Sequence, residues 1–309
     1  DRDRRASAWS MYRRSVMFAA LAGLFGLSVA GIAEGAPEEN PPPGSMVELH
    51  PKSAPFPTKD STYKDDTVLA FIPEHFNFPA NGKVDVIVHF HGHKGTAHRA
   101  IRGHMLREQL NKSKQNAILV VPQGPVMASD GDFGKLMRKN GLSKLLNEVL
   151  GSLAKDKKLG GSGKPKLGRV IASAHSGGYR AAAMAIKHGG VDLREVYLFD
   201  ALYGELEHFE AFAAKKKKLV SYFVGGEPMT NSLALADTLK GRGVKVLVES
   251  GDVRLDREDL VKGKALFLRG RASHGTATFE EGALRDCLLA SCLKGNGTKE
   301  WHQQKDKKR

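Results

Sequence analysis

The stretch GRVIASAHSGGYRAAAMA, residues 168–185, predicts a strand, a tight turn and a helix in direct succession. Residues 170–172 are apolar, largely β-branched and close to a glycine, which is typical of a short buried strand. From Tyr179 onward, alanines and Ile186 recur at helical spacing, and alanine is the best helix former. The small residues of segment 174–178 let the chain reverse between the two. The turn therefore places Ser176 at the N-terminus of a helix, where free N–H groups and a partial positive charge favour an oxyanion.

This turn resembles the nucleophile elbow of the α/β-hydrolase superfamily, whose pattern is G-x-S-x-G. Ala174 stands in place of the first glycine, Ser176 has the position of the nucleophile, and Gly178 is the last glycine. The resemblance implies a Ser-His-acid triad whose acid and histidine come later in the chain, and an oxyanion hole that includes the N–H of Gly177. The alternative interpretation is a serine-glycine turn that closes an ordinary βα unit.

Strands and helices alternate along the rest of the chain. We expect strands at residues 67–72, 84–90, 117–121, 170–172, 196–199, 219–224, 244–249 and 265–268. We expect helices at residues 96–110 and 142–153, from Tyr179, at a segment capped by Asn231, and from Thr278. This alternation predicts an α/β fold, a three-layer αβα sandwich with a mainly parallel sheet. The α/β-hydrolase resemblance requires the same order of elements, and it covers residues 67–295 as one catalytic domain.

The segments outside that domain differ from it in composition. Residues 1–36 are predicted to be a signal-peptide segment in which Met11 is the start of translation. Two arginines in it precede an apolar run that ends in small residues. Residues 37–66 are rich in proline and are expected to be a linker or arm without a core of its own. Residues 296–309 are predicted to be a basic tail. We therefore expect an exported protein, periplasmic or extracellular, with a retained membrane anchor as the alternative.

The composition is that of a globular protein, with 41% hydrophobic and 27% charged residues. Lys and Arg outnumber Asp and Glu by 48 to 34, and the resulting net charge of +14 favours an anionic surface such as a cell-wall polymer or a membrane. The sequence has no zinc-finger spacing and no basic motif interleaved with aromatic residues, so we expect no dedicated nucleic-acid binding. The two cysteines, Cys287 and Cys292, are compatible with a disulfide or with two free thiols.

A nucleophilic serine needs a histidine to take its proton and a carboxylate to orient that histidine. His274 lies in a loop of small residues after a late strand, which is where the resemblance places the base. Asp200 is the favoured acid, because it ends a strand in an apolar context where a carboxylate is costly without a partner. Glu227, after the next strand, is the main alternative acid, and Asp252 is a distant one. An exposed loop histidine and a capping aspartate are the structural alternatives for these positions.

The segment HFHGH, residues 89–93, follows a strongly predicted strand. It resembles the histidine-glycine segment with which α/β-hydrolases build the oxyanion hole. The resemblance implies that N–H groups near Gly92 and His93, together with that of Gly177, hold the oxygen of a tetrahedral intermediate.

The same segment allows a metal site as a rival interpretation. His89, His91 and His93 alternate, and side chains two apart on a strand share a face. With help from His98 or His104 they could bind zinc. The segment is partly similar to the H-x-H-x-D-H motif of metallo-β-lactamase-type hydrolases, but glycine stands where that motif has its aspartate.

The side chains expected to contact substrate are Arg180, His91, His175 and Tyr203. Arg180 has two equal interpretations, a partner for a substrate carboxylate or for an acid of the chain itself. The sequence as a whole predicts an exported serine hydrolase that cleaves an ester or amide of a small molecule or polymer through an acyl-enzyme, without a cofactor. The alternatives are a metal-dependent hydrolase and a non-catalytic module of the same fold that binds anionic cell-wall polymer.

Overall fold

The computed structural model describes residues 41–129, 131–249 and 253–295. The predicted signal peptide at 1–36, the predicted basic tail at 296–309 and the alternative acid Asp252 lie outside these ranges.

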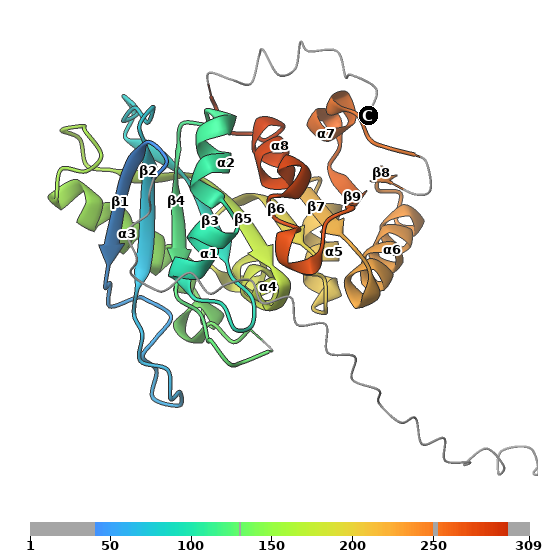
Figure 1. The fold of residues 1–309 in the computed structure, drawn as a ribbon, viewed down its shortest axis with the longest axis horizontal. Coiled ribbons are helices and arrows are strands. Elements are labelled where there is room, and N and C mark those ends of the chain that lie inside the picture. The colour runs from blue at the N-terminus through green and yellow to red at the C-terminus, as the bar shows by residue number, and fades with distance from the viewer. Residues whose placement is uncertain (1–40, 130, 250–252, 296–309) are drawn as a thin grey trace, which may run out of the picture. The chain divides into compact units, whose positions relative to one another are not determined.

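A nine-stranded sheet runs through the described part of the chain in the order β1-β2-β4-β3-β5-β6-β7-β9-β8 (Figure 1). β2 pairs antiparallel with β1 and with β4, and every other neighbouring pair is parallel. The strands are β1 Gly44–Leu49, β2 Val68–Pro73, β3 Lys83–Phe90, β4 Ala117–Pro122, β5 Lys166–His175, β6 Leu193–Phe199, β7 Lys218–Phe223, β8 Val246–Val248 and β9 Ala265–Arg269. β5, which carries the predicted nucleophile turn, lies in the middle of this sheet.

Helices cover both faces of the sheet, and each face has its own apolar core (Figure 1). The helices of one face are α3 Gly141–Lys155, α4 Tyr179–His188, α5 Leu206–Ala214 and α6 Gly226–Gly241. Those of the other face are α1 Ala97–Gly103, α2 Leu106–Ser113, α7 Arg257–Lys262 and α8 Ala283–Leu289. In α3 the leucine and valine stripe that predicted the helix is entirely buried. The predicted fold class, a three-layer α/β sandwich with a mainly parallel sheet, is confirmed.

The prediction that residues 37–66 form a linker without a core is wrong for residues 41–66. Residues 44–49 form β1 at the edge of the sheet, and Ala54 and Phe56 are buried in the domain at 0% and 2% exposure. The carboxylate of Glu148 in α3 accepts hydrogen bonds from the backbone N–H of Lys52 and of Ser53, at 2.8 and 3.0 Å. A six-residue strand between prolines gives little signal of its own, and it is stabilised by pairing with β2.

The helix predicted at residues 96–110 is two helices. α1 ends at Gly103, Met105 adopts the left-handed conformation with φ 49°, and α2 begins at Leu106. The apolar spacing continues across this break because Ile101, Leu106 and Leu110 all pack into the same core. The pattern therefore predicted which residues are buried but missed the break between them.

The starts of two predicted helices also differ from the prediction. α6 begins at Gly226 rather than at Asn231, whose side-chain amide instead donates to the carbonyl of Leu202 at 2.9 Å. α8 begins at Ala283, and Thr278 is a buried residue of the loop before it. The short helices α5 and α7 were not predicted. Both cysteines are free thiols.

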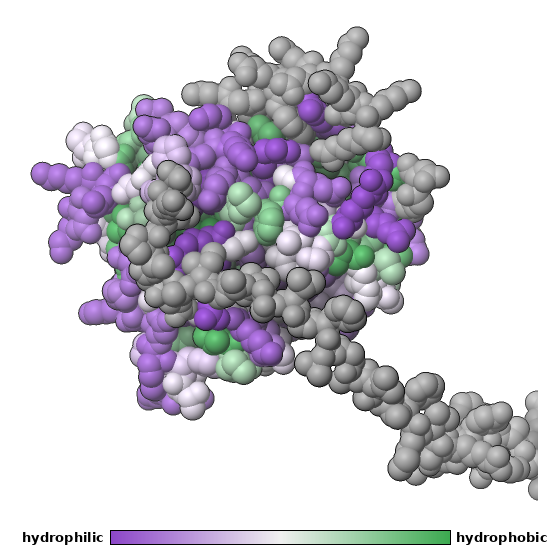
Figure 2. Space-filling model, in the orientation of Figure 1, coloured by the Kyte–Doolittle hydropathy of each residue, from purple (hydrophilic) through white to green (hydrophobic). Residues whose placement is uncertain are grey.

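Among the residues that the structure describes, the large apolar side chains that remain exposed are Met46, Met105, Met127, Leu233 and Val253. Figure 2 shows mostly hydrophilic residues on the side that carries α2 and α8, with apolar residues between them. None of the helices within the described ranges has the length and apolar character needed to cross a membrane.

Candidate active site

Ser176 lies on a tightly packed turn between β5 and α4. Its φ is 52°, a conformation that is costly for a residue with a side chain. A Cβ atom added to Gly178 would lie 2.3 Å from the carbonyl oxygen of Phe90, so only glycine fits there. Ser176 is the first residue of a short 3₁₀ segment, Ser176–Gly178, and this segment leads directly into α4. The side chain of Ser176 is thereby held out of the sheet at the carboxyl end of β5.

A chain of hydrogen bonds joins Ser176, His274 and Asp200. The Nε2 atom of His274 lies 3.0 Å from Ser176 Oγ, and its Nδ1 atom lies 2.6 Å from Asp200 Oδ2. Because an ionised carboxylate only accepts, Nδ1 carries the proton and donates to Asp200. Nε2 is then the free acceptor for the hydroxyl proton of Ser176. The arrangement can remove a proton from the serine and stabilise the resulting imidazolium.

Asp200 directly follows β6 and is the acid that reaches His274. Asp200 is 3% exposed, and its Oδ1 atom accepts a hydrogen bond from the backbone N–H of Val224 at 3.0 Å. The two carboxylate oxygens thus have separate partners, one from each neighbouring loop. Glu227, the alternative acid, lies exposed in the first turn of α6. Among the described residues, Asp200 is the acid in contact with His274.

The loop after β3 lies directly against the serine. A Cβ atom added to Gly92 would be 2.6 Å from Ser176 Cβ, and one added to Gly177 would be 3.6 Å from the backbone nitrogen of His93. Gly177 follows the serine in the first turn of the helical segment, where N–H groups have no intrahelical acceptor. Gly92, His93 and Gly177, the three residues predicted for the oxyanion hole, are therefore neighbours around Ser176.

His91 was predicted to contact substrate, but it is buried at 1% exposure and supports the loop after β3. Its Nδ1 donates to the carbonyl of Gly92 at 2.9 Å, and its Nε2 accepts from the backbone N–H of Gly124 at 2.7 Å. Burial lowers the pKa of His91 to about 4, so the ring is neutral at pH 7. His91 thus ties the loop of the oxyanion residues to the segment after β4.

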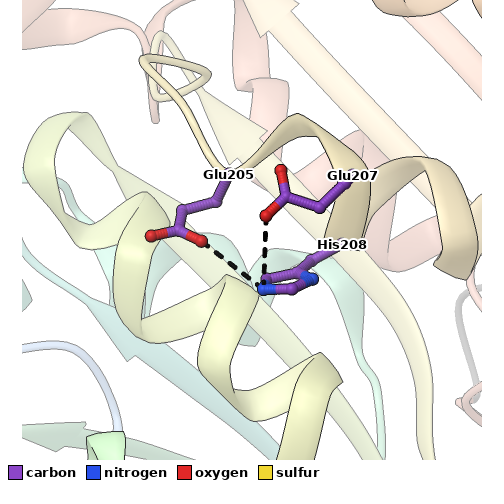
Figure 3. Close-up of side chains that lie close together, drawn as sticks. All are labelled: Glu205, Glu207 and His208. Atoms are coloured by element: carbon purple, nitrogen blue, oxygen red, sulfur yellow. Dashed lines mark ion pairs between the residues drawn. The ribbon is translucent and has the colours of Figure 1, made fainter.

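The three histidines of the alternative metal site face different partners. The ring nitrogens of His89 lie 2.9 Å from Ser173 Oγ and 3.1 Å from His104 Nδ1. His93 is exposed, and His98 pairs with Glu48 at 3.1 Å. Within the described residues, the side chains that bring three possible ligand atoms together are instead Glu205, Glu207 and His208 (Figure 3).

Arg180, in the first turn of α4, pairs with an acid of the chain itself. Its Nε atom lies 3.5 Å from Glu205 Oε1. The other oxygen of Glu205 lies 3.4 Å from His208 Nε2, and a carboxylate oxygen of Glu207 lies 3.6 Å from the same nitrogen. Figure 3 shows both carboxylates directed at the His208 ring. Of the two interpretations of Arg180, this contact matches the internal ion pair.

The other two side chains predicted to contact substrate lie on either side of His274. The ring of Tyr203 meets that of His274 edge-on, with 6.4 Å between the ring centres, and burial raises the pKa of Tyr203. His175 is buried at 7% exposure beneath the His274 loop, with Nε2 2.7 Å from the carbonyl oxygen of His274. Tyr203 therefore lines the site, whereas His175 lies under it. Two further residues of the site, Val224 and His104, lie in no recognisable motif. The backbone of Val224 donates to Asp200, and His104, which the sequence suggested only as a metal ligand, packs against His175.

No known protein family and no curated protein matches this sequence. Solved structures do match. A ferulic acid esterase is 13% identical, with a TM-score of 0.50 over 80% of this chain and 96% of that one. The S-formylglutathione hydrolase FrmB of Staphylococcus aureus is 10% identical, with a TM-score of 0.48 over 79% and 96%. The fluorophosphonate-binding serine hydrolase FphF of the same organism is 12% identical, with a TM-score of 0.46 over 80% and 98%.

Proposed function

We propose that this chain, which has the α/β-hydrolase fold, is a serine hydrolase that cleaves an ester or amide through an acyl-enzyme. The observation that carries the proposal is the hydrogen-bonded chain of Ser176, His274 and Asp200 on a strained turn at the centre of the sheet. Strained backbone at a nucleophile is a recurring feature of functional sites.

The geometry supports a two-step reaction. His274 Nε2 takes the proton of Ser176 Oγ as that oxygen attacks the substrate carbonyl, and Asp200 stabilises the imidazolium. The N–H groups of Gly177 and His93 donate to the oxyanion of the tetrahedral intermediate. His274 then gives its proton to the leaving alcohol or amine, and the acyl group remains on the serine. Water, deprotonated by the same nitrogen, releases the acid and restores the enzyme.

Esters are the substrates to test first, in small-molecule and in polymer form. The similar structure with a TM-score of 0.50 is named a ferulic acid esterase, which supports hydrolysis as the reaction class. Export to the periplasm or the outside of the cell and attraction to an anionic surface are further parts of the proposal. They rest on the apolar leader and on the net charge of +14.

Labelling with a fluorophosphonate probe tests the proposal directly. The wild-type protein should be labelled and should hydrolyse a chromogenic ester, while Ser176→Ala should lose both activities. His274→Ala should lose labelling because the serine is no longer activated. An equal activity of the wild type and Ser176→Ala would refute the proposal. Addition of a chelator to each sample distinguishes the serine hydrolase from the metal-dependent alternative. The metal-dependent alternative requires the activity to vanish on chelation.

A further inference from the structure

Behind the serine, four histidines lie in a row that runs from the core to the active site. We call His89, His104, His175 and His274 the histidine row. His89 Nε2 lies 3.1 Å from His104 Nδ1, and the ring centres of His104 and His175 are 4.6 Å apart. The rings of His175 and His274 follow at 4.8 Å. His274, the proposed base, is thus the outermost member of the row.

His175 contacts His274 in two ways. Its Nε2 atom lies 2.7 Å from the carbonyl oxygen of His274, and because a carbonyl only accepts, Nε2 must carry the proton and donate it. Its ring also packs against the His274 ring, with an angle of 39° between the planes. One side chain therefore fixes both the backbone and the ring of the proposed base. Asp200 holds the same ring at its Nδ1 atom.

The rest of the row holds His175 from below. His89 is fully buried on β3, and its Nδ1 contacts Ser173, the residue opposite it on β5. The break between α1 and α2 places His104 beside His175. The side-chain amide of Gln109 donates both to the carbonyl of His104, at 2.9 Å, and to that of Thr278, at 3.2 Å. The row is therefore attached to the segment that follows His274.

All three inner members of the row are uncharged at pH 7. Burial lowers the pKa of His175 to about 4 and the pKa values of His89 and His104 well below the usual 6.5. The titratable groups that face His175 are His89, His91, His104, His274 and Asp200. A neutral His175 can donate to the His274 carbonyl without placing a second positive charge beside the imidazolium that forms during catalysis.

We propose that His175 is a positioning residue for His274, which it holds so that Nε2 stays within reach of Ser176 Oγ. This inference rests on the proposed function. It assigns His175 a contact with the base instead of the contact with substrate that was expected from the sequence. A displacement of about 1 Å in a catalytic group costs on the order of 100-fold in rate.

His175→Phe and His175→Gln separate positioning from packing. Phenylalanine keeps a ring against His104 and His274 but has no donor, whereas glutamine keeps an N–H close to the position of Nε2. Rates are expressed per active site, titrated with a fluorophosphonate, so that a loss of folded protein does not lower them. We expect His175→Phe to lower kcat by about 10- to 100-fold with KM within about twofold. His175→Gln should recover most of that loss.

His188 is the matched control. Its Nε2 lies 2.7 Å from the carbonyl oxygen of Met137, the same kind of bond at the same distance, at the far end of the helix that follows the serine. His188→Phe should leave kcat unchanged. An equal fall of kcat in His188→Phe and His175→Phe would overturn the inference, because any lost histidine bond would then have the same effect.

The outcomes also separate this inference from the proposed function. A wild type that shows neither labelling nor turnover overturns the proposed function. An active wild type with an unchanged kcat in His175→Phe, or with a raised KM alone, overturns only the positioning role. Should His175→Phe not fold, the ¹⁵N NMR signals of the wild-type imidazoles decide the question. The inference requires a proton on Nε2 of His175 at pH 7, and a proton on Nδ1 instead would refute it.

Discussion

Replacing Asp200 with asparagine should reverse the direction of the hydrogen bonds at the active site. The backbone N–H of Val224 donates to Oδ1 at 3.0 Å, so the amide must keep its oxygen at that position. Its NH₂ group then takes the place of Oδ2, 2.6 Å from His274 Nδ1, and donates to that nitrogen. The ring proton moves to Nε2, which lies 3.0 Å from Ser176 Oγ. His274 would then present a donor to the serine and could not take its proton.

The expected loss is large and specific to catalysis. The same change in a Ser-His-Asp triad lowers kcat by about 10⁴, which corresponds to roughly 5 kcal/mol in the activation free energy. The fold should survive, because Asp200 has φ 45° and asparagine tolerates this left-handed conformation well. The measurement is kcat on an ester that the wild type cleaves, with thermal unfolding followed by circular dichroism as the check on folding.

The exposed acid Glu227 provides the control. Glu227→Gln removes the alternative acid at a position that has no contact with His274 among the described residues, and it should leave kcat within about twofold of the wild type. Retention of more than a tenth of the activity by Asp200→Asn, or a comparable loss in Glu227→Gln, would refute the reasoning.

Two further predictions concern the glycine beside the serine and the buried histidines. Gly92→Ala places a Cβ 2.6 Å from Ser176 Cβ and should lower kcat by about 100-fold. Gly103→Ala should leave kcat unchanged, because a Cβ there meets no atom within 4 Å outside its chain neighbours and its own helix backbone. Equal rates in the two variants would contradict this prediction. His91 and His175 have pKa values of about 4 when folded and gain protons more readily when unfolded. The free energy of unfolding is therefore highest above pH 6.5 and should fall by roughly 3 kcal/mol per group between pH 6.5 and 4. Urea unfolding across this range measures the fall, and an unchanged midpoint would argue against it.

The central strand and the serine turn were the most predictable parts of this protein. The signal is local there: a buried strand, small residues that close a tight turn, and an alanine-rich helix stand next to one another in residues 168–185. The alternation of strands and helices then limits the fold to a layered α/β sandwich. The structure places Ser176, His274 and Asp200 in one hydrogen-bonded chain, although 98 residues separate the serine from the histidine.

The parts that the sequence did not predict depend on contacts with distant residues. β1 is held by pairing with β2, and the break at Met105 leaves the apolar spacing of α1 and α2 intact. His175 was expected to contact substrate. Its actual partner is a carbonyl 99 residues away in the chain, which no local pattern indicates.

The position of β1 decides where a shortened form of this protein can begin. β1 covers the edge of β2 along its full length, from Gly44 opposite Pro73 to Leu49 opposite Val68. An expression clone trimmed to start at Thr67, the boundary that the sequence pattern suggests, would leave the N–H and C=O groups along that edge of β2 unpaired. Open strand edges of this kind recruit other chains, so such a clone should aggregate. Recombinant production should therefore start ahead of Gly44.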